Sequence, residues 1–214
     1  SVWAFGRGKT SWLIEHRVLM GDTARDDVWQ RLKGLLDETW TRSRGSKTVQ
    51  MPLARLAIDT GFATQEAYSF VRACRDPRVM AVKGVARGAA LIGTPTAVDV
   101  TQGGRRLRRG VKVFAVASSI AKIELYNNLR KQVEIEVDDD DPEIEVMSYP
   151  HGYVHLPKVD AEYLQQLCAE QLITRRDRNG YPVREWQKMR ERNEALDCYV
   201  YARAAASAAG LDRF

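Results

Sequence analysis

The sequence has few cysteines and no long hydrophobic run. Its 214 residues include three cysteines, none in a Cys-x-x-Cys pair, so no disulfide framework is indicated and a reducing cytosol is favoured. No apolar run approaches the length of a membrane span, and no membrane partner is expected. No secretory signal is visible at the start, and no internal repeat is found. The remaining composition is that of a globular protein with one substantial core.

Three familiar ligand motifs are incomplete. The GRGKT segment at residues 6–10 lacks the first glycine of a phosphate loop, because Trp3 stands there, and a strand follows it where the motif needs a helix. Asp138–Asp141 lack the glycine and the final glutamate of a calcium loop, which favours a solvated hairpin tip. His151 and His155 have the spacing of a helical zinc pair, but the neighbouring prolines oppose a helix, and in a strand the rings would stand about 13 Å apart.

Charge is distributed unevenly, although the formal net charge is only +5. Residues 72–131 include 13 basic and 3 acidic residues, whereas residues 132–170 include 1 basic and 11 acidic residues. This asymmetry predicts one surface that binds a polyanion and another that repels it.

Each of these charged segments is expected to contain a β-hairpin. In the basic region, residues 86–117, short apolar stretches alternate with turn sequences, and few aromatic residues are available to stack bases. We expect its cations to neutralise the phosphates of duplex DNA without reading bases. These cations are Arg105, Arg106, Arg108, Arg109 and Lys112. In the acidic region, residues 132–157, two alternating strands flank the Asp138–Asp141 tip and would repel DNA.

The stretch from Leu53 to Gln65, LARLAIDTGFATQ, predicts a buried strand, a turn and a helix. The strand ends at Asp59, Gly61 makes the turn, and Thr64 is expected to cap the helix. An acid at the carboxyl end of a strand lies where open α/β sheets place their chemistry. Asp59 can equally be a turn former, because Asp and Gly favour turns for backbone reasons.

The next strand is expected over Met80–Val85. Lys83 would then lie at the same edge of the sheet as Asp59 if the two strands run parallel. It is a candidate contact for a phosphate, and a solvated lysine is the alternative.

A long helix is expected over Trp186–Ala209, because this stretch is rich in Ala, Arg and Glu and has no Gly or Pro before Gly210. Asp197 would lie in its middle. A charged residue in an apolar helix is costly unless a partner compensates it, and a metal ion would do so. A salt bridge to Arg192 or Arg203 is the alternative.

Hydrophobic periodicity predicts the rest of the framework. Two strands of a hairpin are expected over residues 2–8 and 11–20, and helices over 22–40 (capped by Asp22 or Thr23), 119–131 and 159–172. Polar residues 41–49 are expected to form a loop, and residues 174–183 a turn. Strands alternating with helices predict a single α/β domain over residues 1–214.

Five segments carry motifs that occur together, in this order, in one known family. They are IDTGFATQEAY at Ile58–Tyr68, VKG at Val82–Gly84, HGYVHLP at His151–Pro157, YLQQLCAE at Tyr163–Glu170 and RNEALDCYVYA at Arg192–Ala202. With them the chain resembles the nuclease domain of the lambda-type large terminase subunit of tailed bacteriophages.

The resemblance implies an RNase H-like fold, a mixed sheet flanked by helices, that cleaves DNA with two Mg²⁺ or Mn²⁺ ions. By the resemblance, Asp59 and Asp197 match two of the family's three metal-binding carboxylates. Asn193 or Glu194, one turn before Asp197, could support the second of these. In the family the first acid lies on an opening, central strand. This sequence begins with what resembles the second strand, so the first strand is expected to be missing.

The resemblance further implies cutting of concatemeric double-stranded DNA during genome packaging in the cytoplasm of a bacterial host. The implied partners are a small terminase subunit, a portal protein and an ATPase motor upstream in the full-length chain. Two other classes remain open: another RNase H-like nuclease of the resolvase or transposase type, and a non-catalytic DNA-binding or assembly module.

Overall fold

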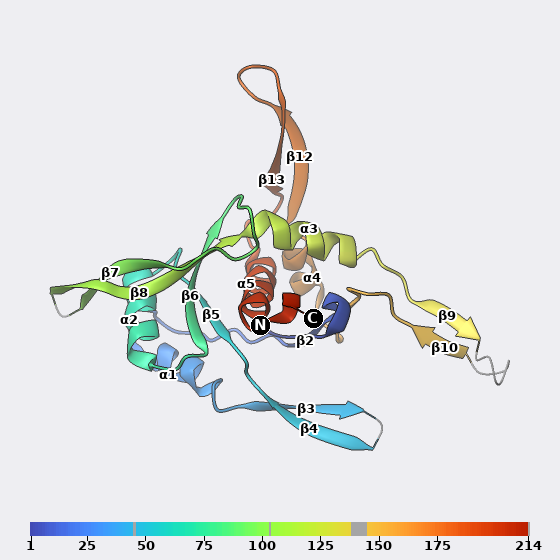
Figure 1. The fold of residues 1–214 in the computed structure, drawn as a ribbon, viewed down its shortest axis with the longest axis horizontal. Helices are drawn as coiled ribbons and strands as arrows, with labels where there is room; N and C mark the ends of the chain where they lie inside the picture. Colours follow the sequence, from blue (N-terminus) through green and yellow to red (C-terminus); the bar gives the residue numbers. More distant parts are fainter. Residues whose placement is uncertain (45, 103, 138–144, 214) are drawn as a thin grey trace. The chain divides into compact units, whose positions relative to one another are not determined.

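The computed structural model describes residues 1–44, 46–102, 104–137 and 145–213. Strands and helices alternate along the chain, and helices flank the sheets, as expected for a mixed α/β protein (Figure 1). Contacts within the chain define two compact units. The first unit holds residues 1–16, 119–200 and 213, and the second holds residues 17–118 and 201–212. The boundary falls inside helix α5 (Glu194–Ala208), which contributes residues to both units.

A four-stranded sheet organises the second unit (Figure 1). Its strands, in spatial order, are β5 (Leu56–Asp59), β6 (Val79–Val85), β8 (Arg105–Ala117) and β7 (Thr96–Gln102). The first three run parallel, and β7 is antiparallel to β8. Helix α2 (Thr64–Cys74) connects β5 to β6, so the strand, turn and helix predicted around Asp59 are confirmed. The parallel β6 strand and the basic hairpin are confirmed as well.

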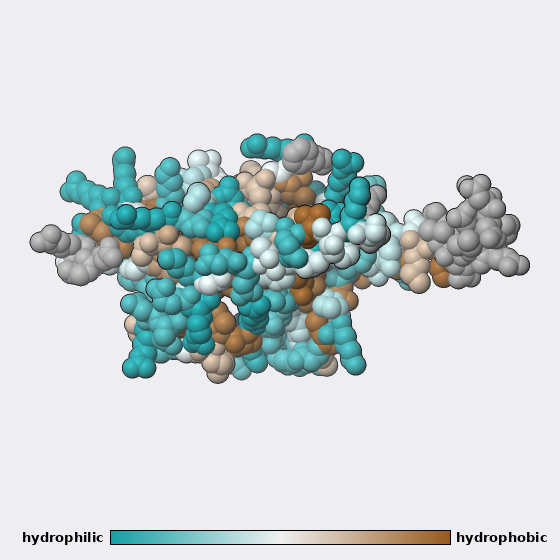
Figure 2. Space-filling model, turned by 90° about the horizontal axis from the view of Figure 1, so that it is seen from below, coloured by the Kyte–Doolittle hydropathy of each residue, from teal (hydrophilic) through white to brown (hydrophobic). Residues whose placement is uncertain are grey.

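One face of this sheet is buried under α2. Ile58, Ala81 and Val113 occupy one row across three strands, and the row packs against the apolar side of α2. Trp29 of helix α1 (Asp26–Gly34) stacks on Phe70 of α2, with ring centroids 5.0 Å apart. Burial of such side chains is the main stabilising term for the unit. In the view of Figure 2, hydrophilic residues cover much of the described surface, with smaller hydrophobic patches between them.

Three expectations for the second unit are wrong in detail. Helix α1 ends at Gly34, well before Trp40, which lies in strand β3 (Thr39–Arg44). Its N-terminal position is Arg25, with no side-chain cap, because Asp22 instead accepts a hydrogen bond from the Ala24 N–H at 2.9 Å. The expected loop at 41–49 is a ribbon of β3 and β4 (Lys47–Pro52). Only the hydrogen bonds between its two strands hold this ribbon, and neither of its faces is buried. The sequence therefore lacks the alternation of apolar and polar residues that would have predicted two strands.

The first unit contains a small sheet and two ribbons. Strands β1 (Val2–Phe5) and β2 (Ser11–Glu15) form the predicted hairpin, with a short helical turn, η1 (Arg7–Lys9), between them. Strand β11 (Val154–His155) adds parallel to β2. The ribbons are β9 (Glu134–Val137) with β10 (Glu145–Ser148), and β12 (Glu170–Arg176) with β13 (Pro182–Lys188). The Asp138–Asp141 run lies outside the described residues.

Three helices surround the core of the first unit: α3 (Ser118–Asn128), α4 (Ala161–Leu167) and the first turns of α5. Leu125, Leu167 and Leu196 are fully buried there. Trp3 meets Tyr199 edge-on, with ring centroids 4.9 Å apart. After α5 comes a second short helical turn, η2 (Leu211–Arg213), whose first two residues belong to the second unit.

The C-terminal segment corrects the sequence-based assignment. The expected turn at 174–183 is part of the β12–β13 ribbon, and Trp186 lies in β13. Helix α4 is also shorter than the predicted helix over 159–172. The last helix begins at Glu194, which places Asp197 in its first turn and not in its middle. Among the described residues, no helix combines the length and apolar character needed to cross a membrane.

Candidate functional site

Asp59 lies at the carboxyl end of β5 on a rigid turn. Its carboxylate is exposed and accepts a hydrogen bond from the Gly61 N–H at 3.0 Å. Thr60, only 1% exposed, donates both its N–H and its hydroxyl to the Val82 carbonyl, each at 2.9 Å. These bonds fix the strand end to β6. Asp59 therefore makes the turn and also presents its carboxylate to solvent.

The start of α2 differs from the expected cap. Thr64 is the first helical residue, and its hydroxyl donates to the Thr60 carbonyl at 2.9 Å. The N-cap position is Ala63, in the left-handed region at φ 45°, with no side-chain cap. Thr64 therefore satisfies a carbonyl of the turn, where an N-cap would satisfy a free N–H of the helix.

The pleat of the sheet separates Asp59 from Lys83. Asp59 is paired with Val82 in the parallel ladder, so the two side chains share one face. Lys83, the next residue of β6, is exposed and projects toward the opposite face. The two residues lie at the same edge of the sheet, as predicted, but alternation places them on different sides of it.

Tyr201 of α5 lies over the face that carries Asp59. Gly84 lies two residues beyond Val82 and so shares that face, and a Cβ at Gly84 would lie 2.9 Å from the hydroxyl oxygen of Tyr201.

Asp197 is half-buried in the first turn of α5. Its N–H donates to the Asn193 carbonyl at 3.1 Å, the first bond of the helix. The free N–H groups and the dipole of a helix N-terminus favour a negative charge at this position. Asn193 donates its side-chain amide to Glu170 at 3.2 Å, and Glu194 pairs with Arg192 at 3.5 Å. Support of Asp197 by Asn193 or Glu194 side chains stays a prediction.

The two arginines considered as partners of Asp197 have carboxylates beside them. Arg203, 2% exposed, forms a two-pronged pair with Asp212 at 2.6 and 3.2 Å. Arg192 lies 3.7 Å from Glu162 in addition to its contact with Glu194. A salt bridge between Asp197 and either arginine stays a prediction.

Each of the two candidate acids has the chemistry of a ligand for a hard divalent cation. Asp59 and Asp197 provide carboxylate oxygens, which Mg²⁺ and Mn²⁺ prefer. Each acid belongs to a different unit, and within the described ranges no group of three or more His, Cys, Asp or Glu side chains forms a metal cluster. A shared two-metal site stays a prediction.

The basic hairpin is shaped by a bulge in β8. One residue of β7, Asp99, lies opposite three residues of β8, Arg108–Gly110. The Asp99 carboxylate accepts from the Arg109 N–H at 2.9 Å and from Arg106 at 2.7 and 2.9 Å. These bonds lower the pKa of Asp99, and the bond from the Arg109 N–H has the largest effect. Arg72 of α2 donates to the Gly110 carbonyl at 3.1 Å and holds the bulge from the other side.

The bulge turns basic side chains outward. Arg109 adopts a left-handed conformation with φ 51°, and bulges of this kind re-aim neighbouring side chains. Arg106, Arg108, Arg109 and Lys112 are all exposed. For Arg105, which opens β8, only the backbone is described. The hairpin thus presents a cationic surface of the kind that contacts phosphates.

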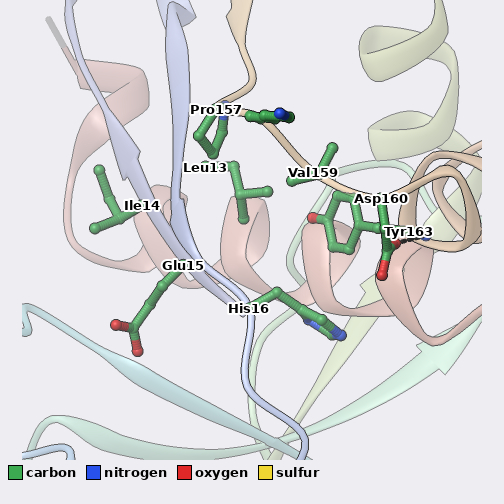
Figure 3. Close-up of a pocket in the computed structure, with 9 residues that line it drawn as sticks. Leu13, Ile14, Glu15, His16, Pro157, Val159, Asp160 and Tyr163 are labelled. Atoms are coloured by element: carbon green, nitrogen blue, oxygen red, sulfur yellow. Dashed lines mark hydrogen bonds between the residues drawn. The ribbon is translucent and has the colours of Figure 1, made fainter.

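A cavity of about 330 Å³ lies elsewhere, in the first unit (Figure 3). Asp160 on its wall is the N-cap of α4 and accepts from the Tyr163 N–H at 2.7 Å. The His16 ring lies edge-on to Tyr163 at 5.0 Å, and burial lowers the pKa of His16. Glu15 points away from His16 and Asp160 (Figure 3). The wall groups have structural roles, and neither candidate metal ligand lines this cavity.

Glu170 is a site feature that sequence reasoning missed. It ends the YLQQLCAE motif and forms a buried ion pair with Lys122. Its position as the last residue of a shared motif was the available signal. Its neighbours become visible only in three dimensions, because they lie 48 and 23 residues away.

Comparison with known proteins identifies the family to which the chain belongs. The family described as "Terminase large subunit gpA, endonuclease domain" matches residues 1–214. The chain belongs to this family of phage terminase endonuclease domains.

Two relatives come from individual phages. The terminase large subunit of Escherichia phage lambda is 30% identical over 210 residues, which cover 95% of this chain and 29% of that protein. The terminase large subunit of Enterobacteria phage P21 is 28% identical over 206 residues, again 95% and 29% of the respective chains. The chain therefore spans less than a third of the length of these relatives. No solved structure matches it.

Proposed function

We propose that this domain cuts concatemeric double-stranded viral DNA during genome packaging, by metal-dependent phosphodiester hydrolysis. The observation that carries the proposal is the match of the terminase endonuclease family to the entire chain. Two further features support it: an exposed carboxylate at the end of a parallel strand, and an exposed cationic hairpin in the same unit. The fold and the cations suit a polyanionic substrate.

Each proposed ligand would come from a rigid element. Asp59 would bind from the end of β5 and Asp197 from the first turn of α5. Two Mg²⁺ or Mn²⁺ ions, when bound, would activate water and stabilise the charge on the attacking and leaving oxygens. Arg105, Arg106, Arg108, Arg109 and Lys112 would hold the duplex by its phosphates, which positions the strand but does not select a sequence. We also propose that Lys83 contacts a phosphate, from the face of the sheet opposite that of Asp59.

We further propose an RNase H-like fold that joins both units into one nuclease domain over residues 1–214. In the described part of the chain, β5 is the outer strand of its sheet, so its free edge can accept one more strand. That further strand would bring the third carboxylate. The proposed setting is the cytoplasm of a bacterial host. The proposed partners are a small terminase subunit, a portal protein and an upstream ATPase motor.

A non-catalytic DNA-binding module is the second candidate. The hydrogen bond from the Gly61 N–H favours it, because a turn role alone would account for Asp59. The candidates differ in one measurable property: a nuclease needs both acids for metal binding, and a binding module does not.

The experiment that tests the proposal is a calorimetric Mn²⁺ titration. It compares the wild-type chain with Asp59→Asn and Asp197→Asn, and plasmid nicking is measured in parallel. Each variant removes one ligand charge and is expected to weaken Mn²⁺ binding by at least about 10-fold. Glu66→Gln and Glu191→Gln, at exposed acids near each site, are the matched controls and should bind as wild type does. Unchanged Mn²⁺ binding in both Asn variants would overturn the proposal and favour the module.

A further inference from the structure

A buried ion pair lies behind the first turn of α5. Lys122 of α3 and Glu170 of β12 are 2.7 Å apart, and their side chains are 8% and 9% exposed. Placing two charges out of water costs several kcal/mol per ion, and a well-packed apolar pair would often be as stable. Stability alone therefore does not account for the pair, and its hydrogen bonds to neighbouring residues do.

The second oxygen of Glu170 connects the pair to Asp197. Glu170 Oε2 accepts from Lys122, and Oε1 accepts from the Asn193 side-chain amide at 3.2 Å. The Asn193 carbonyl in turn accepts from the Asp197 N–H at 3.1 Å. A continuous chain of hydrogen bonds therefore runs from the ion pair to the backbone of Asp197.

A second bond holds the same turn. Gln166 of α4, 5% exposed, accepts from the Ala195 N–H at 3.3 Å. The N-terminal turn of α5 is thus fixed at two points, by one carboxylate and one amide. Because these bonds use the free N-terminal groups of the helix and its flanking residue, they set where the helix starts.

Two aromatic side chains flank the network formed by Lys122, Glu170 and Asn193. The Trp186 indole of β13 donates to the Ser119 hydroxyl at 3.0 Å, and the Lys122 ammonium lies 5.8 Å from the Trp186 ring. The Tyr126 hydroxyl accepts from the Glu170 N–H at 3.4 Å, and burial raises the pKa of Tyr126 to about 12. In Figure 1 the base of the β12–β13 ribbon meets α3 at this place. The members of the network are buried or partly buried, and the low local dielectric strengthens each bond.

We propose that Glu170 is a positioning residue for the candidate metal site. Charge-compensated by Lys122, it holds Asn193 and the first turn of α5, and so fixes the position of the Asp197 carboxylate. An ionised acceptor forms a stronger hydrogen bond than a neutral one, which suits a group that must hold a ligand against the pull of a cation. The inference rests on the proposed role of Asp197.

Removing Glu170 alone would leave the Lys122 ammonium buried without its partner, and the chain could unfold for that reason. The test therefore compares two double variants in which both charges are gone. Lys122→Met/Glu170→Gln keeps an oxygen acceptor for Asn193, and Lys122→Met/Glu170→Leu removes it. Asn193→Ala is a third variant, with the ion pair intact. Glu185→Gln, an exposed acid of the same ribbon, is the control.

The measurements are Mn²⁺ affinity and hydrogen exchange of the backbone amides of residues 195–198. The Leu double variant and Asn193→Ala are expected to bind Mn²⁺ about 10-fold more weakly and to exchange these amides faster. The Gln double variant is expected to stay within about 3-fold of wild type. Equal Mn²⁺ affinity and equal exchange in the Gln and Leu double variants would overturn the inference.

Failure of the proposed function gives a different pattern. If Asp197→Asn binds Mn²⁺ as wild type does, the role of Asp197 is refuted and the positioning role falls with it. If Asp197→Asn loses Mn²⁺ while the Leu double variant and Asn193→Ala retain it, the metal site stands and only the role of Glu170 is refuted.

Discussion

Replacing Gly84 by alanine is expected to destabilise the protein through a single atom. The new Cβ would lie 2.9 Å from the Tyr201 hydroxyl oxygen, whereas the next atoms of that ring are 3.8 and 4.0 Å away, at ordinary contact distance. Removing the hydroxyl oxygen by Tyr201→Phe should therefore make room for the methyl group. The two substitutions are expected to be strongly coupled.

The magnitude follows from two opposing terms. Overpacking costs about 1–3 kcal/mol, and a Gly to Ala change at a compatible backbone position returns about 0.4–1 kcal/mol by restricting the unfolded chain. Gly84→Ala should then lower the free energy of unfolding by about 1 kcal/mol. In the Tyr201→Phe background the same change should be neutral or raise it by about 0.5 kcal/mol, for a coupling energy of about 1.5 kcal/mol.

Urea unfolding of wild type, both single variants and the double variant measures this coupling. The cycle cancels whatever other interactions the Tyr201 hydroxyl makes. Gly34→Ala is the control, because a Cβ at Gly34 has no atom within 4 Å and should stabilise α1. Additive effects, with a coupling energy below about 0.3 kcal/mol, would show that the contact does not exist in solution and would refute the placement of α5 over Gly84.

Three further predictions concern the hairpin and the core. The pKa of Asp99 is lowered, so its bonds stabilise the hairpin above its unfolded-state pKa and are lost as pH falls through the lower folded-state pKa. The protection of the Arg109 amide against hydrogen exchange, relative to its intrinsic rate at each pH, should fall over that range, and in Asp99→Asn it should be low already at neutral pH. Arg108→Ala should reduce the slope of duplex affinity against salt concentration by about 1, measured by fluorescence anisotropy, and an unchanged slope would exclude a phosphate contact. Leu125→Ala, at a fully buried side chain of α3, should cost about 2–5 kcal/mol in urea unfolding, and a loss below about 1 kcal/mol would contradict the packing of the first unit.

The elements that the sequence predicts well are those with a local signal. The β5 strand, its turn and α2 follow from an apolar run, an Asp-Thr-Gly turn and a helix-forming stretch. The basic hairpin follows from alternation and turn residues. In these segments, the residues that determine the secondary structure are close to one another in the sequence.

The missed elements depend on partners far along the chain. The β3–β4 and β12–β13 ribbons are polar and exposed along most of their length, so nothing but their own ladder marks them. The stretch after Trp186 has helix-forming composition, yet Trp186 is held in β13 by its bond to Ser119, 67 residues away. The β12–β13 ladder takes up the chain as far as Lys188, and the helix begins at Glu194 with Asp197 in its first turn.

In the candidate site, too, features with a local sequence signal could be predicted and features that depend on distant residues could not. Asp59 could be identified from its own neighbourhood, and so could the chemistry of its carboxylate. That Lys83 lies on the other face could not be known before the register of β5 and β6 was known, because one step of register moves a side chain across the sheet. The Glu170 network has no local signal, since its members lie on four separate elements or their flanking residues.

The bulge pinned by Asp99 is a feature of the kind that opposes pairing between edge strands of separate copies. In the described part of the chain, β7 is an outer strand of its sheet, and an outer strand offers unpaired N–H and C=O groups to any passing chain. The bulge twists the neighbouring strand, and like-charged arginines beside it repel a second copy of the same hairpin. A variant with a regular, neutral hairpin at this place would lose both the bulge and the charge repulsion. It would expose a flat edge on which strands of other copies could stack into insoluble fibres.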